Sequence, residues 1–386
     1  MSDKSRQPQL FYQFLGSHSL LIGLLPFYLP VYLWGIGFNL SHISLLIGIS
    51  GLGFCAALTL WQRLSRSLPL KTLLFITFAL EVVLVASTFL ADFGIVAILL
   101  IAIANGLYNG FFWTTQRTLF LQLLGNNDSG KRYGNFQIFV TVFLKIGILA
   151  GGWLLDAGGL PWLLAISAAI GALFTWWFFG RASAEPLHAQ PLITFRSALT
   201  YHDKRGSRPV FITDGFFLFL ESHYWTLSLF MLADENFAKL GVIVVVLALL
   251  FGLLFYLIKN TIDAFAVSWV FRLSVLLYAV SWIARSFVSE TLSPQILLFM
   301  LLVVTFCSSF FRLAFNKRFF DIAQTTTGIE YLLIKSYLSQ FYLGIGFIAT
   351  ALLLWASDLT TSDALIPMYW LAAIASFIYL SYRREP

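Results

Sequence analysis

The sequence predicts an all-α membrane protein with twelve transmembrane helices in two pseudo-symmetric six-helix bundles. Of its 386 residues, 59% are hydrophobic and 11% are charged, and the mean hydropathy is +0.84. Soluble domains carry about 25% charged residues, so most of this chain's surface must face lipid. Twelve apolar stretches approach or exceed the ~20 residues that a helix needs to cross a bilayer. One basic, proline-containing segment divides them six and six.

The spans follow one another with short loops, and each ends where apolar residues give way to polar ones. The first six are 10–34, 40–63, 70–91, 94–120, 134–157 and 160–180. The other six are 209–232, 239–258, 265–288, 294–316, 330–356 and 363–382. The stretch 181–209 contains three prolines and clustered basic side chains. We therefore expect a linker over 182–208 between an N-terminal bundle, 1–181, and a C-terminal bundle, 209–386.

Lysine and arginine gather in alternate loops, which predicts the orientation of the chain. The 2–3 loop carries Arg63, Arg66 and Lys71, and the linker carries a second cluster. The intervening loops are almost free of basic residues, with Lys239 as an exception. Basic loops stay on the cytoplasmic side of a membrane. Both termini and the linker are therefore expected to be cytoplasmic, in a multi-pass protein of the cell (inner) membrane.

The two halves show a weak internal repeat. Gly16 in span 1 and Gly215 in span 7 are 199 positions apart, and so are Phe111-Phe112 and Phe310-Phe311. Repeats related by an axis along the membrane normal recur among transporters, which place their site at the interface between the repeats.

This arrangement resembles the major facilitator superfamily over essentially the full length of the chain. The family usually has a Gly…Asp-Arg-x-Gly-Arg-Arg signature between spans 2 and 3, where this chain reads LWQRLSRSLPLK. Arg63 and Arg66 keep the basic character, whereas the acidic and glycine positions are lost. The glycine pattern of antiporters in span 5 is partly present, as Gly147, Gly151 and Gly152. The resemblance implies that spans 1, 4, 7 and 10 line a central cavity.

Span 7 concentrates ionisable groups, since Asp214, Glu221 and His223 lie within one apolar stretch. Such groups cost at least ~2.5–3.5 kcal/mol each at the bilayer centre, and they mark functional sites by default. Asp214 and Glu221 are seven residues apart, so they share a helix face. Glu221 falls near the midplane and is a candidate proton-coupling site. The alternative is a structural contact between packed helices.

Spans 4 and 10 each carry a polar stripe. In span 4 it consists of Asn105, Asn109, Phe112 and Gln116, at spacings that keep them on one face. The two asparagines either line a cavity or hydrogen-bond a neighbouring helix. In span 10 the stripe consists of Thr305, Ser308 or Ser309, Arg312 and Asn316. Arg312 either belongs to a gate or extends toward the membrane surface.

Among the other ionisable residues inside spans, four are candidates for a specific role. Lys145 is at the middle of span 5, where it either binds a substrate anion or serves as the counter-ion of Glu221. His18 is either a structural hydrogen-bonding residue or a proton site. Glu81 lies in span 3, which is peripheral in the resembled fold, so a structural or protonated role is favoured. Lys335 is near a membrane boundary and is expected to reach toward the headgroups.

These patterns predict a secondary active transporter of a small solute that works by alternating access. No Walker A motif is present to use ATP, and the membrane carboxylates make protons the expected coupling ion. The mixed charges of Glu221, Asp214, Lys145 and Arg312 favour an anionic or zwitterionic solute. We expect a monomer without metal, cofactor or nucleic acid. The alternatives are a receptor or assembly factor on a transporter fold, or a membrane-embedded enzyme, for which no HExxH or GxSxG motif is present.

The loop charges lead to a topology test. In a background without Cys55 and Cys307, a Gln190→Cys variant is expected to resist an impermeant thiol reagent added outside intact cells and to react after permeabilisation. Rapid labelling in intact cells would reverse the predicted orientation.

Overall fold

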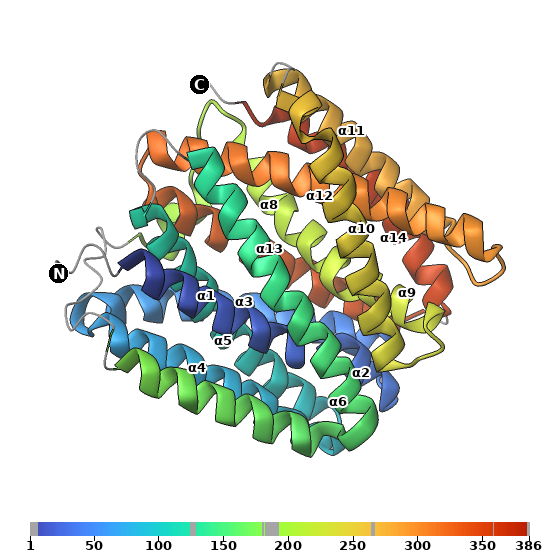
Figure 1. Cartoon of the computed structure of the whole chain (residues 1–386), viewed down its shortest axis with the longest axis horizontal. Coiled ribbons are helices and arrows are strands. Elements are labelled where there is room, and N and C mark those ends of the chain that lie inside the picture. Colours follow the sequence, from blue (N-terminus) through green and yellow to red (C-terminus); the bar gives the residue numbers. More distant parts are fainter. Residues whose placement is uncertain are drawn as a thin grey trace.

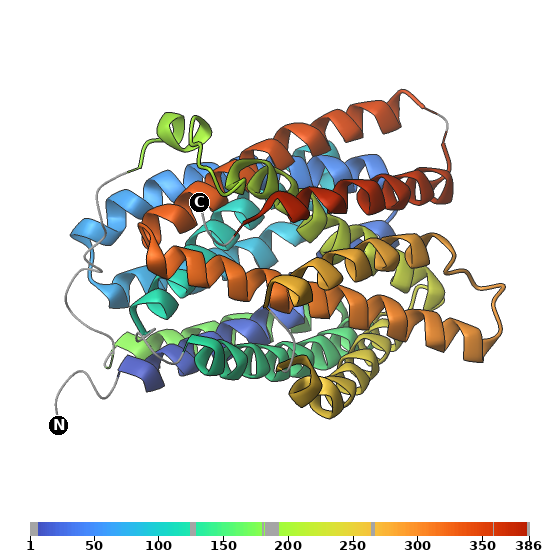
Figure 2. The ribbon, with the colours of Figure 1, turned by 90° about the horizontal axis from the view of Figure 1, so that it is seen from above.

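In the computed structural model, the described residues are 7–123, 129–179, 181, 193–263, 267–357 and 359–383, and all the elements among them are helices. The long helices run roughly side by side along the horizontal direction of Figures 1 and 2, and both ends of the chain lie toward the left in Figure 1. We call the end that carries the termini the terminal end, and the opposite one the distal end.

The N-terminal half contains six membrane spans. Its helices are α1 (Gln7–Leu24), α2 (Leu29–Gly35), α3 (Leu40–Ser67), α4 (Leu70–Ser87), η2 (Thr88–Phe93), α5 (Ile95–Leu123) and α6 (Ser129–Phe179). Span 1 is interrupted between α1 and α2, where Pro26 and Pro30 remove backbone donors. Helix α6 holds spans 5 and 6 and breaks at Gly159, whose φ of 67° favours glycine, two residues before Pro161.

The C-terminal half begins after a short linker helix, α7 (Phe195–Leu199). Its helices are α8 (Ser207–Phe219), η3 (Leu220–Tyr224), α9 (Trp225–Leu232), α10 (Phe237–Asp263), α11 (Val267–Ser286), α12 (Pro294–Thr325), α13 (Ile329–Trp355), α14 (Thr361–Ala375) and η4 (Ser376–Ser381). All twelve predicted spans are thus mainly helical where the structure describes them. Among the residues that the structure describes, eight stretches are long and apolar enough to cross a membrane, and one of these contains both spans 5 and 6.

The two halves repeat the same helix pairings, which confirms the fold predicted from the sequence. Helix α1 packs on α6 as α8 packs on α13, α4 on α5 as α11 on α12, and α4 on α6 as α11 on α14. The glycines of the sequence repeat sit at matching contacts. Gly16 lies against Phe139 of span 5, and Gly215 lies against Ser339 of span 11.

Contacts between the halves run along α3 with α13, α6 with α10, and α2 with α9. At the distal end, the indole of Trp34 donates to Glu235 at 3.0 Å, and the amide of Ala238 donates to Asp156 at 2.8 Å. At the terminal end, Gln62 donates to the hydroxyl of Tyr337 at 2.9 Å. Contacts between the halves are therefore present at both ends of the molecule.

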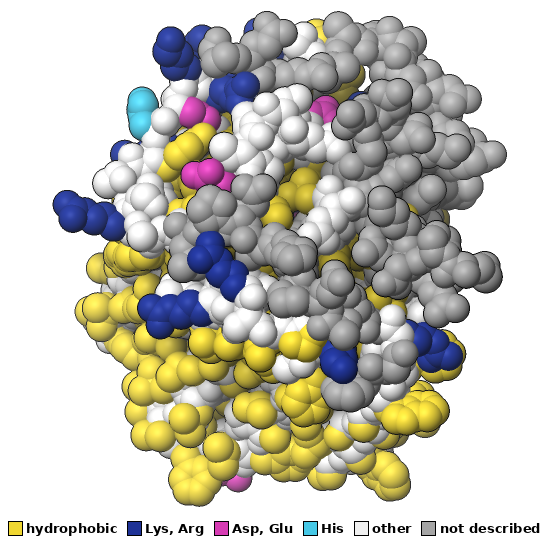
Figure 3. Space-filling view, turned by 90° about the vertical axis from the view of Figure 1, so that its left-hand side faces the viewer, with side chains coloured by type: hydrophobic (Ala, Val, Ile, Leu, Met, Phe, Trp, Pro, Cys, Tyr) yellow, Lys and Arg dark blue, Asp and Glu magenta, His cyan; other side chains and the backbone are white. Residues whose placement is uncertain are grey.

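The two ends differ in charge. Figure 3 looks onto the terminal end, where dark blue Lys and Arg side chains outnumber the acidic ones. Exposed basic residues there include Arg63, Arg66, Arg196, Lys204 and Lys317. The exposed charged residues of the distal end are mostly acidic, namely Asp92, Asp156, Asp234, Glu235, Lys239, Glu290 and Asp363. This is the charge asymmetry expected when the terminal end faces the cytoplasm.

Close packing of span 5 on span 1 depends on Gly147. A Cβ added there would meet the carbonyl oxygen of Leu20 and approach the Cα of Gly23 at 3.0 Å. Gly147→Ala is expected to lower the free energy of unfolding by about 1–3 kcal/mol, as overpacking does, measured by chemical unfolding in detergent. Gly171→Ala is the control, because its Cβ would meet Val82 at an ordinary 3.6 Å. Equal effects of both substitutions would contradict this packing.

Candidate functional site

The site is built around span 7, in which the helix changes its winding. Helix α8 carries Asp214, and the next turn, Leu220–Tyr224, is a π-helix that carries Glu221. Single π-helical turns inside α-helices are rare and often occur at functional sites. As the spacing predicts, the two carboxylates face the same partner, Arg312 of α12.

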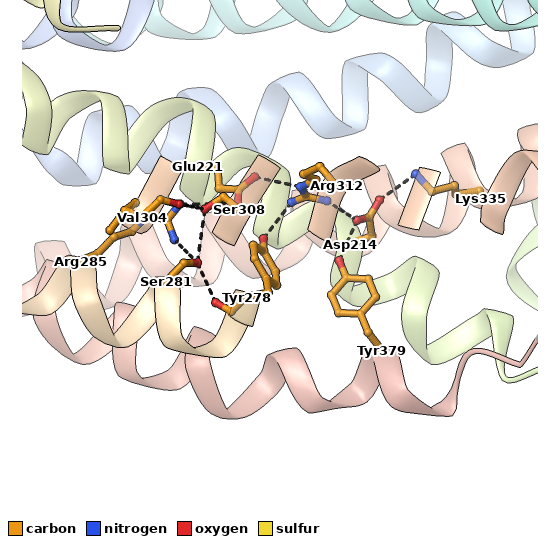
Figure 4. A network of polar contacts seen from close by, with 10 residues as sticks. All are labelled: Asp214, Glu221, Tyr278, Ser281, Arg285, Val304, Ser308, Arg312, Lys335 and Tyr379. Atoms are coloured by element: carbon orange, nitrogen blue, oxygen red, sulfur yellow. Dashed lines mark hydrogen bonds and ion pairs between the residues drawn. The ribbon is translucent and has the colours of Figure 1, made fainter. Parts of the chain in front are cut away.

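Arg312 joins three helices through its guanidinium group. Its Nη1 contacts Oδ1 of Asp214 at 2.7 Å, its Nε donates to Oε2 of Glu221 at 2.9 Å, and its Nη2 donates to the hydroxyl of Tyr278 at 3.0 Å. Figure 4 shows Arg312 between the two carboxylates, with Tyr278 below it. Of the two alternatives for Arg312, extension toward the membrane surface is wrong, because three of the N–H groups of its guanidinium bind partners within the bundle.

Asp214 has two more partners. The Nζ of Lys335 lies 2.7 Å from its Oδ2, and the hydroxyl of Tyr379 donates to Oδ1 at 2.7 Å. Lys335 is 5% exposed, and its Nζ lies 5.1 Å from the centre of the Phe319 ring. The expectation that Lys335 reaches toward the headgroups is therefore wrong. The nearby carboxylate compensates its charge inside the protein.

Glu221 has a second cation that sequence reasoning missed. Nη2 of Arg285 lies 3.6 Å from Oε1 of Glu221 and donates to Ser308 at 2.8 Å, while Nη1 donates to Ser281 at 3.0 Å. Arg285 is 3% exposed, and its guanidinium carbon lies 4.1 Å from the centre of the Trp282 ring. One sequence signal could have found it, because Arg285 is a basic residue near the distal end of its span, where basic residues are scarce.

We call these groups the charge network: Asp214, Glu221, Tyr278, Arg285, Arg312, Lys335 and Tyr379. It contains three cations and two carboxylates, so with all of them ionised it has one positive charge in excess. The side chains of Arg312 and Glu221 keep 16% and 17% exposure, whereas those of Arg285, Lys335 and Asp214 are almost fully buried. In Figure 4, Tyr278 and Tyr379 lie on the side away from the blue helices of the N-terminal half.

The polar stripe of span 4 divides into two parts. Asn105 is buried and donates to Ser50 of α3 at 3.1 Å. Asn109 is partly exposed, donates to Oδ1 of Asn105 at 2.8 Å and accepts from Trp113 at 3.0 Å. At about 100° per residue, Trp113 lies ~80° to the side of Asn105, and Asn109 lies between them. The partly exposed face is therefore centred beyond Asn109 rather than on the predicted stripe.

The other two members of that stripe face the protein interior. Gln116 is 2% exposed, and its Oε1 accepts no hydrogen bond. Phe112 packs against His18, with the ring centroids 4.6 Å apart. Asn105 thus has the contact expected of an interhelical polar bond, while Asn109 is the better placed of the two asparagines to meet a solute.

Lys145 is not the counter-ion of Glu221. The cations that contact Glu221 are Arg312 and Arg285. Lys145 is partly exposed, and it makes no hydrogen bond or ion pair within the part of the chain described. Its other predicted role, binding an anion, stays a prediction.

His18 and Glu81 come together in the N-terminal half, with Nδ1 and Oε2 3.4 Å apart. They are 0% and 2% exposed and lie apart from the charge network, which belongs to the other half. His223, the third ionisable residue of span 7, is buried and contacts the hydroxyl of its neighbour Ser222 at 2.9 Å.

No family model matches the sequence, and no curated protein matches it. Solved structures do match. A point mutant of the nucleoside transporter NupG aligns with a TM-score of 0.67 and 14% identity, over 97% of this chain and 98% of that one. The D-xylose-proton symporter gives 0.67 and 12%, covering 98% and 97%. A POT family transporter in complex with a thioalcohol-conjugated peptide gives 0.66 and 14%, covering 96% and 94%.

The chain has the fold of these transporters. The major-facilitator-like architecture is thereby confirmed at the level of the fold. Sequence identities of 12–14% support a shared fold but not shared chemistry. The chemistry of the site must therefore be argued from this chain's own side chains.

The buried ion pair of the network can be tested against a surface pair of the same length. Lys335 and Asp214 are 2.7 Å apart and buried, while Lys239 and Asp234 are 2.7 Å apart and mostly exposed. Lys335→Met is expected to cost about 3–5 kcal/mol of unfolding free energy, because it leaves a buried carboxylate short of a partner. Lys239→Met should cost less than about 1 kcal/mol. Comparable losses in detergent unfolding would show that the network does not hold the helices together.

Proposed function

We propose that this protein is a secondary active transporter that moves a small solute across the cell (inner) membrane by alternating access, coupled to protons. The observation that carries the proposal is the charge network in the interior of a transporter fold. Placing charges at membrane depth is costly, and it recurs in substrate and ion pathways. The transporter neighbours support this role, and they support a non-enzymatic one.

The charge balance of the network favours an anionic or zwitterionic solute. Three cations face two carboxylates, so an added carboxylate or phosphate group would neutralise the excess. Arg312 is the cation of the network with the most exposed surface, and it suits bidentate binding of such groups. Lys145, which has no ion-pair partner among the described residues, adds a further positive charge in the N-terminal half. Asn109 offers an amide on the partly exposed face of span 4.

The contacts between the halves fit a two-sided gate. The distal contacts include Trp34 with Glu235, and the terminal contacts include Arg117 with Ser336 at 3.4 Å. These contacts would break while the helix pairings within each half stay intact. In this proposal the bundles 1–181 and 209–386 move as bodies, joined by the cytoplasmic linker 182–208. The terminal end faces the cytoplasm, and the protein acts as a monomer.

A ligand screen tests the proposal. Purified protein is melted with a panel of small carboxylates, phosphates, amino acids and neutral sugars, because a ligand of the native state raises the melting temperature. We expect carboxylates, phosphates or amino acids to raise the melting temperature. The same solutes should be transported by the protein in liposomes under a pH gradient. Arg312→Lys, which keeps the charge and loses the fork geometry, should remove the shift. Stabilisation and transport restricted to neutral sugars would contradict the proposed solute class.

Glu221 distinguishes an anion from a zwitterion. It is the more exposed of the two carboxylates of the network, so the ammonium group of a zwitterion would contact it. Glu221→Gln is expected to weaken zwitterion binding by about tenfold or more, the value of a charged hydrogen bond, and to leave anion binding unchanged or tighter. Titration calorimetry on hits from the screen measures this, with the exposed Glu290→Gln as control. A loss of binding equal for both solute types would contradict the assignment.

A further inference from the structure

His18 of α1 and Glu81 of α4 form an isolated polar pair. Their closest atoms, Nδ1 and Oε2, are 3.4 Å apart, and both side chains are almost wholly buried. None of the nitrogens of His18 or the carboxylate oxygens of Glu81 makes a hydrogen bond. Aromatic rings surround them. Phe78 stacks on the imidazole with a centroid distance of 4.0 Å, and Phe14 and Phe112 each lie 4.6 Å away.

The surrounding helices supply little charge to this pair. Helix α5 contributes Tyr108, whose hydroxyl is buried and has no partner. Helix α6 contributes Phe174 and Phe178 to the same aromatic cluster, and its Lys145 makes no ion pair with Glu81. Within the described residues, no Lys or Arg side chain contacts Glu81.

This isolation decides the protonation of the pair. With His18 neutral and Glu81 ionised, the pair would carry an uncompensated negative charge in an apolar interior, at a cost of several kcal/mol. One added proton removes that charge. A charge-assisted N–H···O bond is about 2.7–2.9 Å long, so at 3.4 Å the two groups are not bonded as an ion pair, and the isolation of the pair favours a proton on Glu81.

The carboxylates of the charge network face the opposite situation. Asp214 contacts Arg312 and Lys335, and Glu221 contacts Arg312 and Arg285. Both are compensated without a proton. Of the three carboxylates that lie deep within the described spans, Glu81 is the one whose charge no Lys or Arg balances. This distinction argues against Glu221 as the group that carries the coupling proton.

The pair and the network lie in different halves of the chain. At the 199-residue offset of the internal repeat, His18 corresponds to Phe217, which packs against Tyr278 of the charge network with ring centroids 5.4 Å apart. One half holds fixed charges, and the other holds a pair that can bind a proton.

We propose that His18 and Glu81 form the proton-binding site of the N-terminal half, separate from the charge network. The proton occupies Glu81 as a carboxylic acid in the enclosed conformation. When the site becomes wet, the O–H bond breaks and the proton leaves through His18 or directly to water, which leaves a carboxylate. Its coupling to solute movement rests on the proposed transport function, whereas proton occupancy does not.

Infrared spectroscopy of the purified protein tests the occupancy without any solute. At neutral pH the wild type is expected to show the C=O stretch of a buried carboxylic acid. Glu81→Gln should lose this band, and Asp214→Asn should keep it. Absence of the band in the wild type, or its persistence in Glu81→Gln, would overturn the proposal. The wild-type spectrum remains decisive if Glu81→Gln fails to fold.

Transfer to D₂O separates a working proton site from a trapped one. Replacement of the proton by a deuteron shifts the carboxylic band, and the shift should be complete while the core amides are still protonated. If the band shifts only together with those amides, the proton leaves by unfolding and has a structural role. Either result can be read without a known solute, so it does not depend on the ligand screen.

Discussion

Compensation of charge in a medium without water is the constraint on which this structure depends. Arg312 meets it for two carboxylates at once, since Asp214 and Glu221 lie two turns apart on span 7. Lys335 and Arg285 then supply one further cation to each. Removing one member leaves the charges of its partners less compensated inside the protein, and breaking a buried pair in this way is strongly destabilising. The network thereby ties spans 7, 9, 10 and 11 together, and Tyr379 adds span 12.

The N-terminal half follows the same pattern of helix pairing with different chemistry at its centre. Aromatic rings fill the positions around His18 and Glu81, and the glycines of span 5 allow close contact with span 1. In the proposed mechanism, the fixed charges of one half bind the solute and the protonatable pair of the other half provides the coupling. A solute bound near Arg312 and a proton bound near Glu81 would then influence each other through the movement of the halves.

The sequence predicts the spans because their length and apolar character are set by the bilayer, and it predicts the break between spans 5 and 6 because Gly159 and Pro161 act locally. It also places Asp214, Glu221 and Arg312 among the site residues, because a charged residue inside an apolar span is costly and indicates a functional site. It does not predict their partners. Periodicity gives the face of a helix but not the neighbour opposite that face, so the sequence predicts Lys335 near the headgroups and does not point to Arg285. The π-helical turn at Glu221 has no local sequence signal that we can identify.

The polar stripe of span 4 shows the same limit. Its residues are spaced to lie on one face of the helix. Gln116 and Phe112 are nevertheless buried inside the N-terminal half, while Asn109 lies at the edge of the exposed surface. A rotation of the helix by a few tens of degrees decides between these outcomes. That rotation is set by packing against α3, where Asn105 binds Ser50, and this packing depends on both helices together.

The central claim is that the two halves close alternately around a charged interior. Paired spin labels test it directly, one pair at Ile36 and Asp234 on the distal end and one at Ser67 and Thr327 on the terminal end, all exposed positions. Distances are measured between the labels of each pair in lipid at acidic and alkaline pH. We predict two distance populations for each pair, with the distal distance lengthening as the terminal one shortens. A single distance for both pairs, unchanged across pH, would contradict the account.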